Sequence, residues 1–290
     1  MKINIIEKRK IWYVVSVVIL LAGMVSMLVQ GLNLGIDFVG GNKITVQFEQ
    51  QVDIADLRTA LNENDLEGSK IQELDNGAFV LKTSEMDQTK QDMVLADLNS
   101  RFGSMEIVES NLVGPSVGEE LKKNAVIALA LAVILMIAYI SYRFELHFAI
   151  AGVIALFHDI FIVVAIFSIL QLEVDSTFIA ALLTIFGYSI NDKIVVFDRI
   201  RENMGRVKKD QLSGIVNMSI GQSFTRSMNT SISTLILLLA MLFFGGETTR
   251  IFVLAMSLGV IVGTYSSLCI ASPIWYEIKM HIKGSRIETK

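Results

Sequence analysis

Cysteine, proline and histidine are scarce in this chain of 290 residues, which contains one, two and three of them respectively. The single cysteine, Cys269, excludes an intramolecular disulfide, and its apolar neighbours indicate a packing residue. The sequence also lacks a phosphate-binding glycine loop and any His/Cys cluster with metal-ligand spacing. We therefore expect no metal site, no cofactor and no hydrolytic activity.

Apolar sequence, by contrast, is abundant, because 52% of the residues are hydrophobic. A run of about 20 apolar residues crosses a hydrocarbon core roughly 30 Å thick. The first run is longer than a usual signal core and no small-residue cleavage site follows it, so we expect it to be retained. Six such runs predict six membrane-spanning helices, at Ile11–Gln30, Asn124–Tyr142, His147–Leu170, Thr177–Asp198, Ser223–Phe244 and Ile251–Tyr276.

Between the first two spans, from about residue 42 to 116, the pattern becomes that of a soluble domain. Asp53 is expected to cap a first helix, and Ser84 with Asp87 to form a capping box for a second. The predicted elements are a strand at Lys43–Phe48, a helix at Asp53–Asn64, a hairpin of Ser69–Leu74 and Ala78–Lys82, a helix at Ser84–Phe102 and a strand at Met105–Leu112. This β-α-β-β-α-β order predicts a small α+β domain with a ferredoxin-like fold.

Basic residues predict the orientation of the six spans. The terminal segments and the loops on the same side carry fourteen lysines and arginines, whereas short loops 171–176 and 245–250 carry only Arg250. By the positive-inside rule, both termini are expected in the cytoplasm and the soluble domain outside it. The predicted organisation is a cytoplasmic N-terminus with helix 1 at 1–34, an extracytoplasmic domain at 35–116, helices 2–6 at 117–278 and a cytoplasmic tail at 279–290.

The exterior domain is acidic, with 17 acidic and 8 basic residues between positions 36 and 123. A negative surface of this kind argues against nucleic acid as a partner.

Asp192 is the residue that most needs an explanation, because it lies inside the fourth apolar run. An ionised carboxylate near the bilayer centre costs about 2.5–3.5 kcal/mol on insertion scales, so it usually faces protein or water. On a helix, Asp192 shares a face with Thr184 and Tyr188, while Lys193 points about 100° away and is not its obvious partner. Asp192 is either an acid neutralised for packing alone or a protonatable group on an ion path.

Arg226 lies within a polar stretch, Ser219–Thr234, in the fifth span. It either extends its side chain to the inner membrane interface or faces a wet cavity or another helix. The polar residues that follow it favour the second interpretation. A guanidinium is permanently charged, so it could hold a carboxylate ionised until that acid moves or takes up a proton.

The pair His158–Asp159 lies near the middle of the third span. It is either a polar pair satisfied by neighbouring helices or a second acid–base station on the same path. A serine-hydrolase site is disfavoured because Ser189 is expected in mid-helix and no Gly-x-Ser-x-Gly turn is present. An intramembrane aspartyl protease is disfavoured because Asp192 follows Ser189-Ile190-Asn191 and not Gly-x-Gly.

Four segments together resemble the SecD/SecF family of membrane proteins. These are the glycine-rich Gly35–Gly41, the pair His158–Asp159, the helix Gly187–Asn203 and the stretch Thr225–Ser231. They occur in the family's order, and the resemblance covers essentially the whole chain. The pair Asn191–Asp192 and Tyr188 favour the SecF branch of the family.

The resemblance implies one six-helix half of a resistance-nodulation-division assembly, with SecD supplying the other half. It further implies an auxiliary unit of the Sec translocase in the bacterial inner membrane, which helps unfolded exported polypeptides leave the SecYEG channel. The driving force would be a proton gradient or, as in some members, a sodium gradient. The family's intramembrane aspartate and arginine map onto Asp192 and Arg226, although this chain has Ser227-Met228 where the family often has Thr-Leu.

From these residues we expect Asp192 and Arg226, assisted by Asn191 and Tyr188, to pair and separate as ions bind. The glycine-rich segment, with Gly35, Asp37, Gly40 and Gly41, is expected to transmit the change to the exterior domain. Two alternatives remain. One is half of a small-molecule exporter of the same superfamily, which would need larger exterior domains. The other is a scaffold for translocase assembly that transports nothing.

Overall fold

The computed structural model describes residues 4–74, 76–205 and 212–285. The chain divides into two compact units, one of residues 1–33 and 127–290 and one of residues 34–126. Six of the basic residues that predict orientation lie outside the described residues: Lys2, Arg206, Lys208, Lys209, Arg286 and Lys290.

Six helices are long and apolar enough to cross a membrane, as the sequence predicts. Five are α1 (Arg9–Val29), α5 (Pro115–Arg143), α6 (Leu146–Ile169), α7 (Ser176–Met204) and α8 (Leu212–Phe244). The sixth span consists of α9 (Glu247–Ser266), one π-helical turn η2 (Ser267–Ala271) and α10 (Ser272–Ser285). Most of these helices extend beyond the predicted runs, because polar residues can continue a helix outside the apolar segment.

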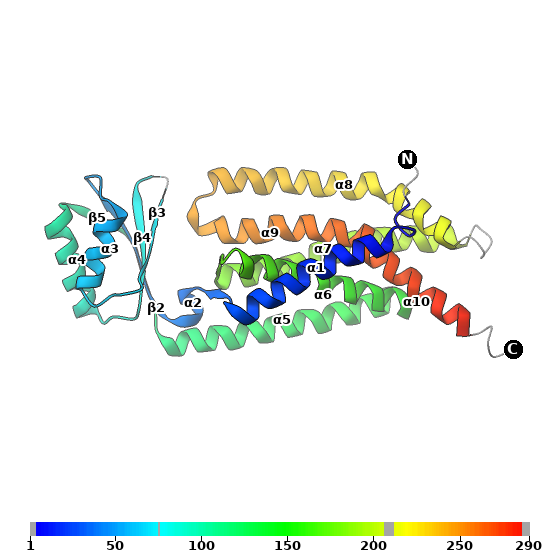
Figure 1. Ribbon diagram of the computed structural model, residues 1–290, viewed down its shortest axis with the longest axis horizontal. Helices are drawn as coiled ribbons and strands as arrows, with labels where there is room; N and C mark the ends of the chain where they lie inside the picture. The colour runs from blue at the N-terminus through cyan, green and yellow to red at the C-terminus, as the bar shows by residue number, and fades with distance from the viewer. Residues whose placement is uncertain (1–3, 75, 206–211, 286–290) are drawn as a thin grey trace. The chain divides into compact units, whose positions relative to one another are not determined.

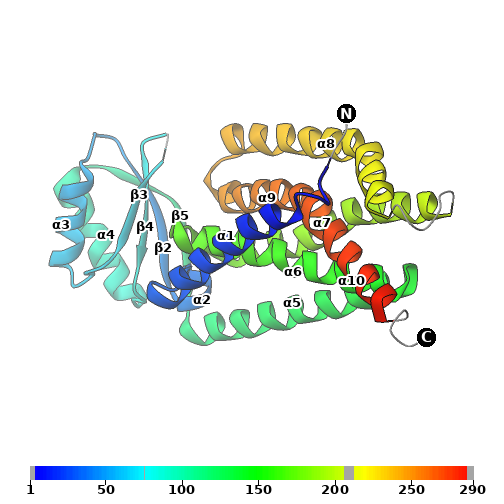
Figure 2. The same ribbon diagram turned by 45° about the vertical axis from the view of Figure 1, so that its right-hand side comes forward.

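The core of the membrane unit lies where α6, α7 and the α9–α10 span meet. Between 50% and 61% of the apolar window of each is buried, against 6% for α5 and 17% for α8. Accordingly, α5 and α8 lie on the outside of the bundle in both views (Figures 1 and 2). At the centre, Phe148 stacks on Trp275 with ring centroids 4.6 Å apart. The exposed faces of α1 and α5 are apolar over much of their length, as expected of helices that contact lipid.

The second unit contains a four-stranded antiparallel sheet of order β3-β4-β2-β5. Its elements are β2 (Gly41–Phe48), α3 (Ile54–Glu63), β3 (Lys70–Glu73), β4 (Ala78–Thr83), α4 (Gln88–Phe102) and β5 (Met105–Val113). Both helices cover one face of the sheet (Figure 1), where alternate strand residues such as Ile44, Val46 and Leu81 form a core with Leu57 and Leu98. This arrangement confirms the predicted ferredoxin-like fold.

The caps of the two helices test the sequence prediction in detail. Asp53 caps α3 by accepting a hydrogen bond from the Ala55 amide at 2.7 Å. The predicted start of α4 at Ser84 is wrong: the cap is Asp87, which accepts from the Lys90 amide at 2.8 Å. Between the two helices, Arg101 and Asn64 donate hydrogen bonds to Asp97 and hold the pKa of that carboxyl below its usual value.

The glycine-rich segment that begins this unit contains a short helix, α2 (Ile36–Val39), preceded by the two-residue strand β1 (Asn33–Leu34). A second two-residue strand, β6 (Glu173–Val174), precedes α7. Gly40 and Gly41 adopt φ of 83° and 141°, which favour glycine. A Cβ on Gly41 would lie 2.4 Å from the carbonyl oxygen of Thr83 in the neighbouring strand. Gly41 is therefore fixed by close contact with β4.

Candidate ion-coupling site

Asp192 lies on α7 with 9% of its surface exposed, and it faces α8. Its Oδ1 accepts a hydrogen bond from the Ser227 hydroxyl at 2.6 Å. Its Oδ2 is buried and has no hydrogen-bond partner among the described residues. The Ser267 hydroxyl lies near this carboxylate but donates at 2.7 Å to the Gly263 carbonyl. Among the described residues, one neutral group, the Ser227 hydroxyl, thus holds this carboxylate by a hydrogen bond.

Arg226, the expected partner of Asp192, is exposed on α8 and forms no ion pair with any described residue. It lines a cleft of about 310 Å³ between α7 and α8. The other residues of this cleft are Asn191, Ile194, Val195, Asp198, Arg199, Glu202, Gln222 and Ser223. Successive helical residues point about 100° apart, so Ser227 meets the acid while Arg226 points into the cleft. In this structure the expected ion pair is not formed.

Tyr188 and Asp192 meet α8 one turn apart. The Tyr188 hydroxyl donates to Ser231 at 3.3 Å, and Ser231 in turn contacts Thr264 on α9. The shared helix face predicted for Tyr188 and Asp192 is therefore present. Thr184, the third residue of that face, is exposed and donates back to the Ala180 carbonyl at 2.8 Å.

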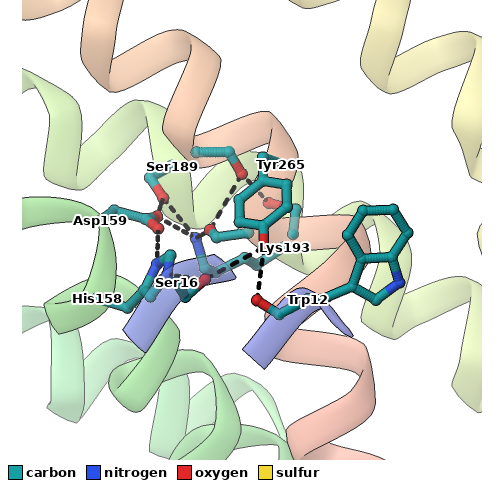
Figure 3. Close-up of polar contacts among 10 residues, drawn as sticks. Trp12, Ser16, His158, Asp159, Ser189, Lys193 and Tyr265 are labelled. Carbon is teal, nitrogen blue, oxygen red and sulfur yellow. Dashed lines mark hydrogen bonds and ion pairs between the residues drawn. The ribbon is translucent and has the colours of Figure 1, made fainter. Parts of the chain in front are cut away.

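His158 and Asp159 on α6 belong to a second polar cluster (Figure 3). Asp159 is completely buried, and its Oδ1 lies 3.0 Å from Nδ1 of His158. Its Oδ2 accepts from Lys193 Nζ at 2.6 Å and from the Ser189 hydroxyl. The Lys193 ammonium also donates to Ser189 at 2.5 Å and to Ser266 at 2.9 Å, so all three of its hydrogens are used.

Lys193 is the functional-site residue that sequence reasoning did not assign. The sequence suggests Lys193 only as a partner for Asp192, and helix geometry disfavours that pairing. The structure agrees, because Lys193 pairs with Asp159 on α6. A lysine in mid-helix among apolar residues is itself a signal, because it requires a buried counter-ion.

The cluster continues from His158 to the first helix of the chain. Nε2 of His158 lies 2.8 Å from the Ser16 hydroxyl, which lies 3.2 Å from the Tyr265 hydroxyl. Tyr265 donates to the Trp12 carbonyl at 2.9 Å. These contacts join α1, α6, α7 and α9 through buried or half-buried polar groups.

The two polar sites approach each other at the π-helical turn η2. Ser266 accepts from Lys193, while the adjacent Ser267, the first residue of η2, lies near Asp192. Single π-turns inside α-helices frequently occur at functional sites. Asp192 and Lys193 are adjacent on α7, as Ser266 and Ser267 are in the sixth span. Each of these pairs of neighbours therefore contributes one residue to each site.

The chemistry available to these groups is the binding and release of a small cation. No group of three or more histidine, cysteine or acidic residues suited to a metal ion occurs within residues 4–74, 76–205 and 212–285. The titratable groups that are present lie in helices that span a membrane. This arrangement is typical of ion pathways.

Comparison with known proteins places these residues in a family context. Residues 94–281 match the family model of the protein export membrane protein SecD/SecF, C-terminal, and residues 25–52 match that of the SecD/SecF GG motif. The protein translocase subunit SecF of Sebaldella termitidis is 38% identical over 99% of this chain and 96% of its own length. The SecF of Acidaminococcus fermentans is 40% identical over 97% of this chain and 99% of its own length.

Longer proteins match as well. The protein translocase subunit SecDF of Bacillus subtilis is 41% identical over 93% of this chain, which corresponds to 37% of that protein. The crystal structure of a Thermus SecDF, described as a translocon-associated membrane protein, matches with a TM-score of 0.88 and 34% identity, over 96% of this chain and 39% of that one. A SecDF in a super-membrane-facing form matches with a TM-score of 0.76 and 34% identity, over 100% of this chain and 40% of that one.

Proposed function

This chain belongs to the SecD/SecF family of protein export membrane proteins, and from that premise we propose that it couples an ion gradient to the export of polypeptides by the Sec translocase. Relatives of nearly equal length are translocase subunits, which supports an auxiliary role in that machinery and a multi-pass location in the inner membrane. The coupling itself is the proposal, and Asp192 carries it.

The supporting observation is the environment of the Asp192 carboxylate. It is buried in a membrane helix, held by one neutral hydroxyl, and its second oxygen has no partner among the described residues. A carboxylate serving packing alone would be expected to have its hydrogen bonds satisfied. Asp192 is therefore proposed to bind a proton or, as in some family members, a sodium ion.

The energy available from one ion is adequate for a conformational change. Moving one charge through 100 mV releases about 2.3 kcal/mol. That free energy biases a two-state equilibrium by about fifty-fold, since 1.4 kcal/mol corresponds to tenfold. It would rock a small domain but not unfold a stable one. We propose that Arg226 leaves its cleft to approach Asp192 in another state, and that Asn191 and Tyr188 guide the exchange.

SecD is the proposed partner within the membrane. Some relatives carry SecD and SecF in one chain, and this chain spans only 37–40% of such proteins. Four polar residues of α8 recur on one face of the helix and are exposed: Gln222, Arg226, Asn229 and Ser233. A membrane helix with an exposed polar face is expected to pack against another protein or a water path. We propose that SecD covers this face of α8.

The remaining partners and the orientation follow from the same proposal. Both termini would lie in the cytoplasm, and residues 35–116 would lie outside, where the acidic domain meets the unfolded polypeptide as it leaves SecYEG. The segment containing Gly35, Asp37, Gly40 and Gly41 would transmit the change between membrane and exterior. The negative charge of the domain argues against nucleic acid as a partner.

An enzymatic role is disfavoured by the state of Ser189. Lys193 lies 2.5 Å from its hydroxyl, which is the arrangement of a Ser-Lys hydrolase pair. A lysine acts as a base only when neutral, but Lys193 donates all three hydrogens and one goes to the Asp159 carboxylate. Ser189 is also completely buried. The exporter alternative is disfavoured because the described residues of the exterior unit are built around a single four-stranded sheet.

Export into inverted membrane vesicles, with proton and sodium gradients varied independently, tests the proposal. Asp192→Asn should abolish the gradient-dependent stimulation of export while membrane insertion and SecD binding remain. Glu145→Gln is the matched control, because it removes an exposed carboxylate at the start of α6 whose side chain makes no cap hydrogen bond. Normal stimulation with Asp192→Asn would remove Asp192 from the mechanism and leave the scaffold alternative.

A further inference from the structure

A chain of four hydrogen-bond contacts leads from Asp159 to the main chain of α1 (Figure 3). It joins Asp159 to His158 at 3.0 Å, His158 to Ser16 at 2.8 Å, Ser16 to Tyr265 at 3.2 Å and Tyr265 to the Trp12 carbonyl at 2.9 Å. Asp159 and Ser16 are 0% and 3% exposed, and His158 is 9% exposed. Each contact requires one hydrogen between its two heavy atoms.

The number of hydrogens in this chain depends on the charge of His158. Carbonyl and carboxylate ends supply none, while the hydroxyls of Ser16 and Tyr265 supply one each. A neutral imidazole supplies one more, giving three hydrogens for four contacts. An imidazolium supplies two, giving four hydrogens for four contacts. The contacts are complete only when His158 carries the additional proton.

The direction of each bond follows from the carbonyl end. Tyr265 must donate to the Trp12 carbonyl, so it can only accept from Ser16. Ser16 then has no hydrogen left for Nε2 of His158, which must itself donate. Nδ1 faces the Asp159 carboxylate and must also donate. With neutral His158, Ser16 instead donates to Nε2, and the contact between Ser16 and Tyr265 loses its hydrogen.

The charges around His158 accommodate this proton. Asp159 of α6 is neutralised by Lys193 of α7, and α1 contributes only the Ser16 hydroxyl and the Trp12 carbonyl, which do not titrate. The phenol Tyr265 of α9 and, next to it, the thiol Cys269 of η2 are neutral near pH 7. The remaining group is Asp192, near Lys193. If Asp192 is ionised, an imidazolium at position 158 makes the four charges sum to zero.

We propose that His158 is a second proton-binding site, separate from Asp192, and that Lys193 and Asp159 are positioning residues that hold its ring. The proton comes from water and adds to the unprotonated Nε2 of His158, while Nδ1 already donates to Asp159. The Ser16 hydroxyl then reverses, from donating to His158 to donating to Tyr265. Binding thereby changes the hydrogen bonds that α1 makes with α6 and α9. This inference deepens the proposed ion coupling and rests on it for its functional meaning.

Nitrogen-15 NMR of the full chain in lipid nanodiscs, with labelled histidine, tests the inference directly. The chain has three histidines, and the ring-nitrogen shifts distinguish both tautomers from the imidazolium. We expect His158 to become doubly protonated on acidification and to keep its hydrogen on Nδ1 when neutral. In Tyr265→Phe, Ser16 can donate to neutral His158 without leaving another contact short of a hydrogen. The neutral form then loses no hydrogen bond relative to the imidazolium. The proton affinity of His158 should therefore fall about fivefold, which corresponds to one typical hydrogen bond.

Ser16→Ala provides a second variant, because it removes the acceptor of Nε2 and should lower the same affinity by a similar factor. Tyr142→Phe is the matched control, since Tyr142 is 91% exposed. A His158 that stays neutral down to pH 4, or a proton affinity unchanged in both test variants, would overturn the proposal. The measurement uses no gradient and no SecD, so a failure of the proposed function, which would be normal gradient-dependent export with Asp192→Asn, is scored separately from the behaviour of His158.

Discussion

Lys193 donates a hydrogen bond to Asp159 across 2.6 Å, and both side chains are completely buried between α7 and α6. Removing one partner of a buried pair leaves an uncompensated charge, which typically costs 3–5 kcal/mol. We therefore expect Lys193→Met to destabilise the membrane unit by about that amount. Lys193→Met with Asp159→Asn should recover much of the loss, because neither charge then remains.

Denaturant unfolding of the purified protein in detergent measures both variants. Lys279→Met is the control, because Lys279 lies 3.7 Å from the exposed Glu145, and pairs of this kind contribute about 0–1 kcal/mol. Equal losses in the single and double variants would mean that Lys193 and Asp159 are not energetically coupled.

Ser227 is predicted to tune the Asp192 site. Ser227→Ala removes the only hydrogen bond that the described residues donate to that carboxylate, so ion-stimulated export should fall several-fold. Ser227→Thr keeps the hydroxyl and should restore it. Ser141→Ala, which changes an exposed serine of α5, is the control. Export assayed across a range of gradients would show no difference between Ser227→Ala and Ser141→Ala if the contact has no role.

The sequence could predict the frame of the fold because long apolar runs and period-two strands are local signals. Six spans and the β-α-β-β-α-β domain follow from them. The ends of the helices do not follow from the apolar runs. For example, α5 begins at Pro115, nine residues before the predicted run at Asn124, because proline is suited to the first turn of a helix. Hydropathy indicates where a helix crosses lipid, whereas caps and turns decide where the helix begins.

The candidate site could be predicted only in part, because the rotation of one helix against another is set by packing. The sequence identifies Asp192, His158 and Asp159 as groups that need a partner in a membrane. It does not determine whether Ser227 or its neighbour Arg226 faces Asp192, and a rotation of about 100° separates the two. Likewise, the pairing of Lys193 with Asp159 depends on the packing of α6 against α7.

Arg226 is predicted to matter for function and little for stability. It is exposed and forms no ion pair with a described residue, so Arg226→Gln should change the free energy of unfolding by no more than about 0.5 kcal/mol. Gradient-driven export should nevertheless be strongly reduced, and Arg226→Lys should be impaired as well if guanidinium geometry is needed. Full export with both variants would mean that Arg226 only extends to the membrane interface.

Gly41 offers a test of how the unit of residues 34–126 begins. Its φ of 141° opposes any side chain there, and so does the Thr83 carbonyl oxygen, which would lie 2.4 Å from an added Cβ. Gly77 shares a positive φ of 79° but has open space around it, so Gly77→Ala should cost only the roughly 1–2 kcal/mol of a left-handed backbone. Gly41→Ala should cost about 1–3 kcal/mol more, because the strand pair must also separate.

Hydrogen exchange of the β2 and β4 amides in the full chain measures both variants. Equal protection in the two variants would show that β2 and β4 separate easily at Gly41, so the proposed flexing could occur at Gly41 itself. Lower protection in Gly41→Ala would confine the proposed flexing to the residues before Gly41.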